Sequence, residues 1–252
     1  MNPFEPTDVP EPLRRWLPAG TTLAYPDQGM TSSVAFAGPV VLKRCTDPLY
    51  LSWLRREREV LGALRGTGLP VPEVLDFLDF GAEAWLVMTR RPGIQCAEAM
   101  LHGSRAEQLE LMRIVGAAAR RLHDTPAPAF FEGRGPWLDR QLHAARENLP
   151  WCDGSPELLE HLLATRPAPV PSTLIHGDLN LENVLVADGA VTGFIDWAGG
   201  DIGDPRCDIT LALVSDEKVI IDAELTEAFY TAYGSGPSPS VRTWYEGLYE
   251  FF

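Results

Sequence analysis

The stretch from residue 173 to residue 208 constrains the fold most, because it encodes a short hairpin between polar segments. Two apolar runs, residues 184–186 and 191–195, are separated by Ala-Asp-Gly-Ala. The Asp188-Gly189 pair is typical of the φ > 0 positions in a tight hairpin turn. The pattern therefore predicts two antiparallel strands joined by a very short turn.

Three polar side chains accompany this hairpin. Asp178 is followed, with four residues between, by Asn183, and Asp196 comes directly after the second run. An antiparallel hairpin brings the start of its first strand beside the end of its second, so we expect Asn183 and Asp196 to meet, with Asp178 in the loop just before. Two carboxylates and an amide oxygen, with no cation beside them in the sequence, suit Mg²⁺ and its phosphate ligands.

A family resemblance rests on these residues. A His, then Asp-x-x-x-x-Asn, a hairpin and a further Asp form the layout of a kinase catalytic loop with its metal-binding Asp. Two sequence motifs resemble those of the aminoglycoside phosphotransferase family: L-I-H-G-D-L-N-L-E-N-V-L-V at 174–186 and G-F-I-D-W at 193–197. Protein kinases would show His-Arg-Asp and Asp-Phe-Gly instead. The resemblance extends from Gly29 to the C-terminus.

The resemblance implies an α+β, protein-kinase-like two-lobed fold. We expect an N-terminal nucleotide-binding lobe at 1–91, with a small antiparallel sheet and one helix. A mainly helical C-terminal lobe at 92–252 would carry the catalytic hairpin and bind the substrate. The implied activity is Mg²⁺-dependent transfer of the γ-phosphate of ATP or GTP to an aminoglycoside hydroxyl, with the 3'-hydroxyl as the expected acceptor.

The resemblance also assigns roles within the central stretch. Asp178 would accept or orient the substrate hydroxyl, and Asn183 and Asp196 would hold Mg²⁺. His176 is expected to form a hydrogen bond within the loop, and Asp208 to tie the loop to the following helix.

A lysine and a glutamate upstream fit the same chemistry. Lys43 ends a short apolar strand at 40–43. This resembles the kinase V-A-I-K pattern, in which the lysine pairs with the α- and β-phosphates of the nucleotide. A helix expected at 48–65 carries Glu57 on the face of Leu61 and Leu64. Periodicity alone leaves Glu59 open as the partner of Lys43, whereas the family spacing favours Glu57.

Other nucleotide contacts follow from the resemblance. Strands expected at 22–25 and 34–36 flank a polar turn that includes Ser32. From its residues alone, this turn is as consistent with an ordinary hairpin turn as with one that binds nucleotide phosphates. In the family this turn positions the nucleotide. A second hairpin, at 74–80 and 85–89, leads into a linker, where Met88, Thr89 and Arg91 match positions around the adenine.

Acidic residues are expected to meet a cationic substrate. The ending Tyr-Glu-Phe-Phe resembles that of the subgroup that phosphorylates the 3'-hydroxyl, so Glu250 and Phe252 match substrate positions. Four further acids could add negative charge to the same cleft: Asp153, Glu157, Asp216 and Glu217. Two positions depart from the family pattern, because Leu181 replaces a frequent acid and Gly199 replaces a frequent arginine.

The C-terminal half should be helical. The pattern predicts helices at 105–124, 137–148, 156–165, near 205–214, at 216–233 with an interruption around Lys218, and at 241–252. In the last of these, Trp244, Leu248 and Phe252 would share one face. His123 is expected to be a hydrogen-bonding residue at a helix end, and Asp201 and Asp204 either hold the central loop or face the substrate.

Composition narrows the class of protein. The chain has 252 residues and a net charge of −14, which argues against nucleic acid or an anionic membrane as a partner. The four cysteines lack zinc or disulfide spacing, and no apolar stretch approaches the ~18 residues of a membrane span. We expect a cytoplasmic protein, and the oligomeric state stays open.

Other functions remain as alternatives. Leu181 leaves open a housekeeping kinase of another small alcohol, such as choline, homoserine or a thiosugar. A catalytically inactive nucleotide-binding module is an alternative of another class. A metallohydrolase built on His176 and Asp178 lacks further ligands at metal spacing.

Overall fold

The computed structural model describes all residues except 1–2, 19, 21, 27–30 and 216–218. The chain separates into two compact units. Unit 1 comprises Met1–Gly93 and Thr192–Gly199, and unit 2 comprises Ile94–Val191 and Gly200–Phe252. The short segment 192–199 of unit 1 thus lies within the range expected for the C-terminal lobe.

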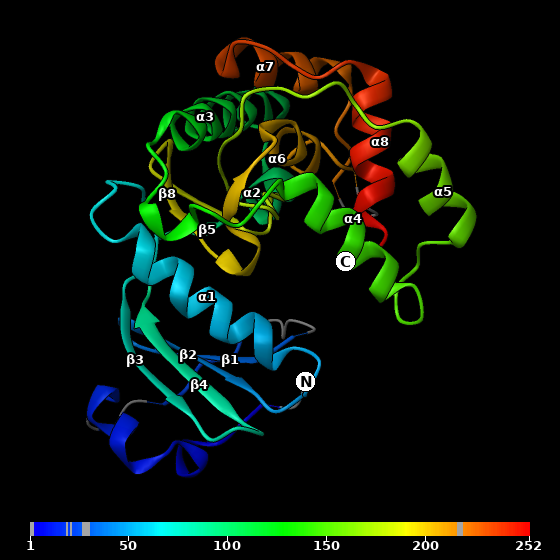
Figure 1. The fold of residues 1–252 in the computed structure, drawn as a ribbon. Coiled ribbons are helices and arrows are strands. Elements are labelled where there is room, and N and C mark those ends of the chain that lie inside the picture. Colours follow the sequence, from blue (N-terminus) through cyan, green and yellow to red (C-terminus); the bar gives the residue numbers. More distant parts are fainter. Residues whose placement is uncertain (1–2, 19, 21, 27–30, 216–218) are drawn as a thin grey trace. The chain divides into compact units, whose positions relative to one another are not determined.

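Unit 1 is a four-stranded antiparallel sheet covered by one helix, α1 (Figure 1). The strand order is β1-β2-β4-β3. The elements are β1 Ser33–Ala37, β2 Val40–Cys45, α1 Leu51–Leu64, β3 Val74–Asp79 and β4 Ala84–Thr89. Strand β4 is buried over most of its length, as a central strand between two neighbours should be. The buried side chains of α1 recur at helical spacing, which gives the helix a single face toward the sheet.

The N-terminal part of unit 1 differs from its prediction. The strand expected at 22–25 is reduced to a single bridge between Ala24 and Phe36. Pro26, which has no backbone N–H, follows two residues later and cannot extend a ladder. Before this bridge the chain forms two 3₁₀ helices, Pro6–Asp8 and Glu11–Trp16. Phe4 and Val9, on either side of the first, and Leu13 of the second pack into the core that includes Trp85.

Unit 2 is mainly helical. Its helices are α2 Cys96–His102, α3 Arg105–Asp124, α4 Trp137–Asn148, α5 Pro156–Ala164, α6 Pro205–Leu211, α7 Ala223–Tyr233 and α8 Pro239–Tyr249, with a 3₁₀ turn at Ala129–Phe131. Helix α3 packs along α7, and α8 packs against α5 and α6 (Figure 1). The predicted bounds of α3 and α4 are confirmed. Among the described residues, no helix is long and apolar enough to cross a membrane.

Short strands frame the central stretch. Strands β5 Ile94–Gln95, β7 Val184–Ala187 and β8 Ala190–Phe194 form one small sheet. The turn between β7 and β8 has φ values of 50° at Asp188 and 72° at Gly189, which confirms the predicted hairpin. Strands β6 Thr173–Ile175 and β9 Asp201–Gly203 form an antiparallel pair that the sequence did not predict. A Cβ on Gly203 would lie 2.5 Å from Ile175 Cδ1 and 2.8 Å from the Trp137 ring, so a larger residue there would force these side chains to shift.

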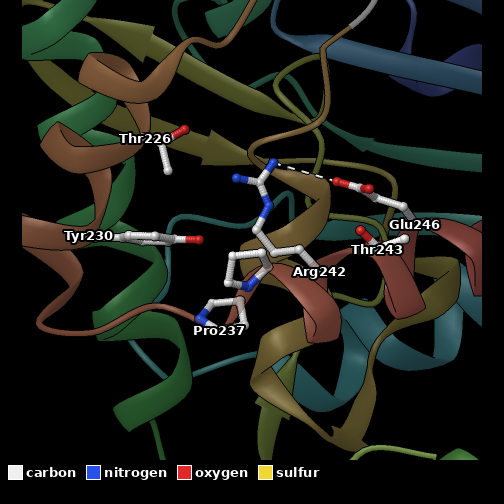
Figure 2. A pocket seen from close by; sticks show the side chains of 7 residues that line it. Thr226, Tyr230, Pro237, Arg242, Thr243 and Glu246 are labelled. Carbon is white, nitrogen blue, oxygen red and sulfur yellow. Dashed lines mark hydrogen bonds and ion pairs between the residues drawn. The ribbon is translucent and has the colours of Figure 1, made fainter. Parts of the chain in front are cut away.

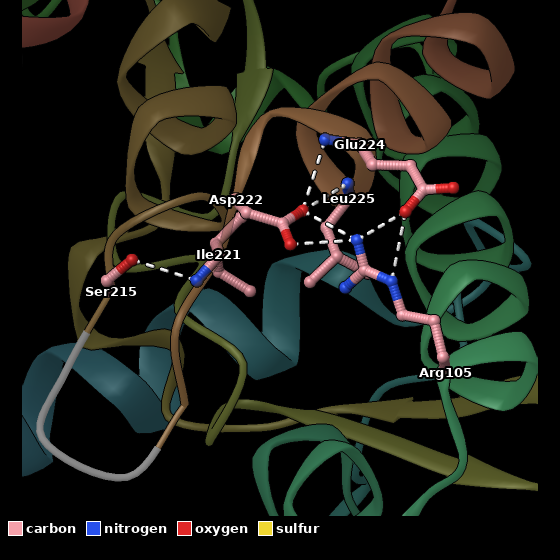
Figure 3. A network of polar contacts seen from close by, with 6 residues as sticks. All are labelled: Arg105, Ser215, Ile221, Asp222, Glu224 and Leu225. Carbon is pink, nitrogen blue, oxygen red and sulfur yellow. Dashed lines mark hydrogen bonds and ion pairs between the residues drawn. The ribbon is translucent and has the colours of Figure 1, made fainter.

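Helix α7 begins at Ala223 (Figure 3). The first three residues of the helix predicted at 216–233 lie outside the described residues. Residues 219–222 are not helical. The Asp222 carboxylate caps the helix by accepting the N–H groups of Glu224 and Leu225, at 3.1 and 3.0 Å. Arg105 forms ion pairs with the carboxylates of both Asp222 and Glu224. A cap held from another helix thus sets the start of α7.

The C-terminal helix also corrects one prediction. Trp244 and Leu248 are buried as expected, but Phe252 is 43% exposed. Helix α8 ends at Tyr249, so the next residues leave the helical face, and Phe251 enters the core instead. A Cβ on Gly154 would lie 2.5 Å from the Phe251 ring, and the Gly154 N–H donates to the Glu250 carbonyl at 2.9 Å. The last residues are therefore fastened to the loop between α4 and α5.

Candidate active site

Lys43 and Glu57 form a buried ion pair in unit 1. Lys43 lies on β2, opposite Leu86 of β4, and Glu57 lies on the buried face of α1. The Lys43 Nζ donates to both carboxylate oxygens of Glu57, at 2.7 and 2.9 Å. Glu59 is exposed on the other side of the helix. The structure therefore selects Glu57 as the partner of Lys43.

Asp196 is a second partner of Lys43 in unit 1. Its Oδ1 accepts a hydrogen bond from the Lys43 Nζ. Asp196 has a φ of 63°, a left-handed conformation that Asp and Asn tolerate better than most residues. The next residue, Trp197, is fully buried and donates from Nε1 to the Phe194 carbonyl at 2.9 Å. The sequence shows no cation beside Asp196, so this contact was not predicted.

The electrostatics of this triad keep Lys43 charged. Burial by itself would lower the pKa of Lys43, but the negative charges of Asp196 and Glu57 raise it above its ordinary value. Burial raises the pKa of Glu57, and the positive charge of Lys43 opposes that change. The Lys43 side chain is 10% exposed and that of Asp196 is 48% exposed. The ammonium is thus enclosed, whereas the Asp196 carboxylate reaches solvent.

Asp178 lies in a loop of unit 2 whose own amides hold its carboxylate. The Nδ2 of Asn183 donates to Asp178 Oδ2 at 2.9 Å and to the Asp178 carbonyl at 2.8 Å. The Nδ2 of Asn180 donates to Asp178 Oδ1 at 3.0 Å. The Asn180 Oδ1 in turn accepts the backbone N–H groups of Glu182 and Asn183. With its amide nitrogen turned to Asp178, Asn183 has Oδ1 as the atom that would bind a metal ion.

A tyrosine that sequence reasoning missed completes this group. The Tyr249 hydroxyl, at the end of α8, donates to Asp178 Oδ1 at 2.9 Å. Burial and the negative charge of Asp178 raise the pKa of Tyr249. Its place in the Tyr-Glu-Phe-Phe ending gives no sign of this contact.

The loop that carries Asp178 is anchored from α6. The fully buried Asp208 accepts the N–H of His176 at 2.7 Å and that of Gly177 at 2.8 Å. The same carboxylate lies 3.0 Å from His123 Nε2, and His123 Nδ1 lies 2.8 Å from the Tyr233 hydroxyl. The predictions that Asp208 ties the loop to the next helix and that His123 is a hydrogen-bonding residue are confirmed. His176 also accepts the Asp178 N–H within the loop, at 3.3 Å.

Asp201 and Asp204 hold structure together in unit 2. Asp201 is buried and pairs with Arg134 at 3.2 Å and with Arg140 at 2.7 Å. Asp204 caps α6 by accepting the N–H of Arg206 at 2.9 Å, and also pairs with its guanidinium. These contacts join Asp201 to Arg134 and to α4, and Asp204 to α6; neither of the two predicted roles, holding the central loop or facing the substrate, is tested by them.

The remaining nucleotide candidates lie in unit 1. Ser32 is buried just before β1, and Met88 is buried within β4. Thr89, at the end of β4, accepts the Glu73 N–H at 2.9 Å through its hydroxyl. Arg91 donates from Nε to the Thr192 carbonyl at 2.9 Å.

The remaining substrate candidates lie in unit 2 or outside the described residues. Asp153 is exposed in the loop between α4 and α5, Glu157 in the first turn of α5, and Glu250 just after α8. Asp216 and Glu217 lie outside the described residues. Leu181, one of the two departures from the family pattern, is buried, and its carbonyl accepts the Ala97 N–H at 3.1 Å.

Comparisons with known proteins agree with this architecture. Residues 31–248 match the family model described as "Phosphotransferase enzyme family". The chain is 30% identical over 223 residues to an aminoglycoside 3'-phosphotransferase of Streptomyces fradiae, covering 80% of this chain and 77% of that protein.

Solved structures show the same fold. An aminoglycoside 3'-phosphotransferase of type VIII superposes with a TM-score of 0.78 at 26% identity, covering 96% of this chain and 97% of that one. The aminoglycoside phosphotransferase APH(3'')-Id of Streptomyces rimosus, in complex with ADP and streptomycin, has a TM-score of 0.71 at 21% identity, covering 95% of each chain. The chain therefore belongs to the aminoglycoside phosphotransferase family and has its protein-kinase-like α+β fold.

Proposed function

We propose that this protein transfers the γ-phosphate of ATP or GTP, with Mg²⁺, to the 3'-hydroxyl of an aminoglycoside. One observation above all supports the proposal. The Asp178 carboxylate is oriented by the amides of Asn180 and Asn183, in the loop where the family places its catalytic residue. The S. fradiae relative, named for the 3' position, favours that hydroxyl, and the neighbour that holds ADP supports nucleotide use.

In this proposal Asp178 is the catalytic residue. Phosphoryl transfer needs the nucleophile held in line with the γ-phosphate and positive charge to offset that of the phosphates. Asp178 would accept a hydrogen bond from the acceptor hydroxyl and later its proton. The carboxylate needs a fixed orientation for this task, and the loop amides provide one.

The residues proposed to hold Mg²⁺ fit that ion. Asn183 would offer its amide oxygen, because its amide nitrogen already donates to Asp178. Asp196 would offer a solvent-reaching carboxylate. Hard oxygen ligands of this kind suit Mg²⁺, which would neutralise charge on the phosphates when bound. Lys43, held by Glu57, would interact with the α- and β-phosphates, while Ser32, Met88, Thr89 and Arg91 would surround the rest of the nucleotide.

The acceptor is proposed to be a polyamine sugar because of the acidic residues. An exposed ion pair contributes only about 0.2–1 kcal/mol, so a cationic drug requires several acids together. Asp153 lies beside Gly154, whose N–H is bonded to the Glu250 carbonyl, so the α4–α5 loop and the chain end are held side by side. The net charge of −14 adds a general attraction for cations. Glu157, Asp216, Glu217 and Phe252 remain candidates for the same role.

The acceptor position can be tested with a matched pair of substrates. We expect ADP release with Mg²⁺-ATP and an aminoglycoside that bears a 3'-hydroxyl, and only background release with its 3'-deoxy analogue. Equal turnover of both would place the transfer at another hydroxyl. Turnover of choline, homoserine or a thiosugar, but of no aminoglycoside, would support the housekeeping-kinase alternative instead.

Nucleotide binding is expected to stabilise the protein. A ligand at a hundred times its Kd adds about 2.7 kcal/mol to the free energy of unfolding, so Mg²⁺-ATP or Mg²⁺-GTP should raise the Tm measurably. The Asp196→Asn variant is the control, because Asn tolerates the left-handed backbone and lacks the charge. We expect this variant to lose most of the Mg²⁺-dependent part of the shift. A Tm unmoved by either nucleotide would contradict the proposed site.

A further inference from the structure

Tyr249 reaches Asp178 from a different part of unit 2. The two residues are 71 positions apart, yet the tyrosine hydroxyl lies 2.9 Å from Asp178 Oδ1. The amides that also hold this carboxylate, those of Asn180 and Asn183, belong to the same loop as Asp178. Tyr249 therefore supplies a restraint that comes from outside the loop.

The position of this hydroxyl is set by a well-packed helix. Trp244, Tyr245 and Leu248 of α8 are buried in the main core of unit 2. The Trp244 Nε1 donates to the Leu162 carbonyl at 3.1 Å. Directly after Tyr249, the chain is held by Phe251 in the core and by the Gly154–Glu250 hydrogen bond. A side chain between two such anchors has a restricted position.

We propose that Tyr249 is a positioning residue for catalysis, whose hydroxyl holds the Asp178 carboxylate in the orientation that receives the acceptor hydroxyl. The inference rests on the proposed function of Asp178. Donors from the loop and from α8 together restrict rotation of the carboxylate, and restricted orientation of a catalytic group lowers the barrier to reaction. The aromatic ring itself takes no part in the chemistry.

The tyrosine is suited to this role because it stays a donor. Burial, and then the charge of Asp178, raise the pKa of Tyr249, so the hydroxyl keeps its proton over the pH range of an assay. A hydrogen bond to a charged group is about twice as strong as a neutral one. Tyr249 is 39% exposed, so it is the charge of its acceptor that makes this contact stronger than a neutral hydrogen bond at the same place.

The test is the Tyr249→Phe variant, which removes one oxygen atom and keeps the ring. We expect kcat for phosphate transfer to fall about tenfold, while the KM values for nucleotide and acceptor stay within about twofold. A loss of orientation affects the chemical step, whereas a loss of substrate contact would raise the acceptor KM. A kcat within twofold of wild type, or a raised acceptor KM at unchanged kcat, would overturn the proposal.

Tyr230→Phe is the matched control. Tyr230 lies on α7 and lines a surface pocket of about 360 Å³ with Arg242 and Thr243 (Figure 2). Its buried hydroxyl has no hydrogen-bond partner among the described residues. The same substitution there should leave kcat and both KM values unchanged. An equal loss of kcat in the two variants would assign the effect to general packing and overturn the proposal.

A spectroscopic measurement separates this inference from the proposed function. With ¹³C at the ζ position of the six tyrosines, the Tyr249 signal is identified by its loss in Tyr249→Phe. We expect it to shift in the Asp178→Ala variant and to keep its position in Tyr230→Phe. An unmoved signal in Asp178→Ala would overturn the contact whether or not the protein transfers phosphate. Absence of transfer by wild type to any hydroxyl acceptor would refute the proposed function, and this signal would still decide the contact.

Discussion

Asp178→Ala is expected to lower kcat for phosphate transfer by about 10²- to 10⁴-fold, the usual contribution of a general base. Nucleotide binding should survive, because Lys43, Glu57 and Asp196 are unchanged. Steady-state ADP release gives the loss of turnover, and the Tm shift with Mg²⁺-ATP reports binding. Loss of both would indicate a collapsed loop instead of a missing catalytic group.

Two further variants test whether the loss of turnover comes from the missing carboxylate of Asp178. Asp178→Asn retains the size of the side chain, so it should be as inactive as the alanine variant if the charge and proton acceptance matter. Asp188→Asn, in the β7–β8 turn, also removes one carboxylate and keeps a residue that tolerates φ of 50°. That control should have wild-type kcat. An Asp178→Asn variant with more than about a tenth of wild-type kcat would contradict the assigned role.

Lys43→Met is expected to have the largest effect on stability. The substitution leaves the Glu57 carboxylate buried without a cation, and breaking a buried pair in this way costs about 3–5 kcal/mol. Urea denaturation at pH 8 measures the loss in the free energy of unfolding. Affinity for Mg²⁺-ATP should fall as well, because the proposed phosphate ligand is gone.

The pH dependence of this loss identifies its cause. Burial already raises the pKa of Glu57, and removing Lys43 takes away the charge that opposes this rise. A group whose pKa is raised in the folded state contributes full stability below its unfolded pKa, about 4.3, and loses it as the pH rises through the folded pKa. The deficit of Lys43→Met relative to wild type should therefore be small at pH 5 and larger at pH 8.

The double variant Lys43→Met/Glu57→Met is the control for this prediction. Replacing both partners of a buried ion pair with apolar side chains is often close to neutral, because no charge is left without a partner. We expect the double variant to recover much of the stability at pH 8 without recovering nucleotide affinity. A single variant as stable as wild type at both pH values would contradict the buried pair.

The predictions that succeeded rest on local patterns. The Asp188-Gly189 turn was predictable because few dipeptides adopt positive φ at both positions. Helix α3 was predictable over its full length because its apolar side chains recur at helical spacing and Ser104 caps its start. Strands β6 and β9 were missed because three residues are too few to display an alternating pattern.

In the candidate site, too, local features were predictable from the sequence and long-range contacts were not. The sequence by itself determined the hairpin, the pattern of Asp178, Asn183 and Asp196, and the presence of Lys43 on a strand, since each depends on neighbours a few residues away. Only the tertiary structure decided that Lys43 meets Asp196, 153 positions away, and that Tyr249 meets Asp178, 71 positions away. The physical reason is that packing of the intervening helices and strands brings these side chains together. A single hydrogen bond between distant residues leaves no periodic trace in either segment.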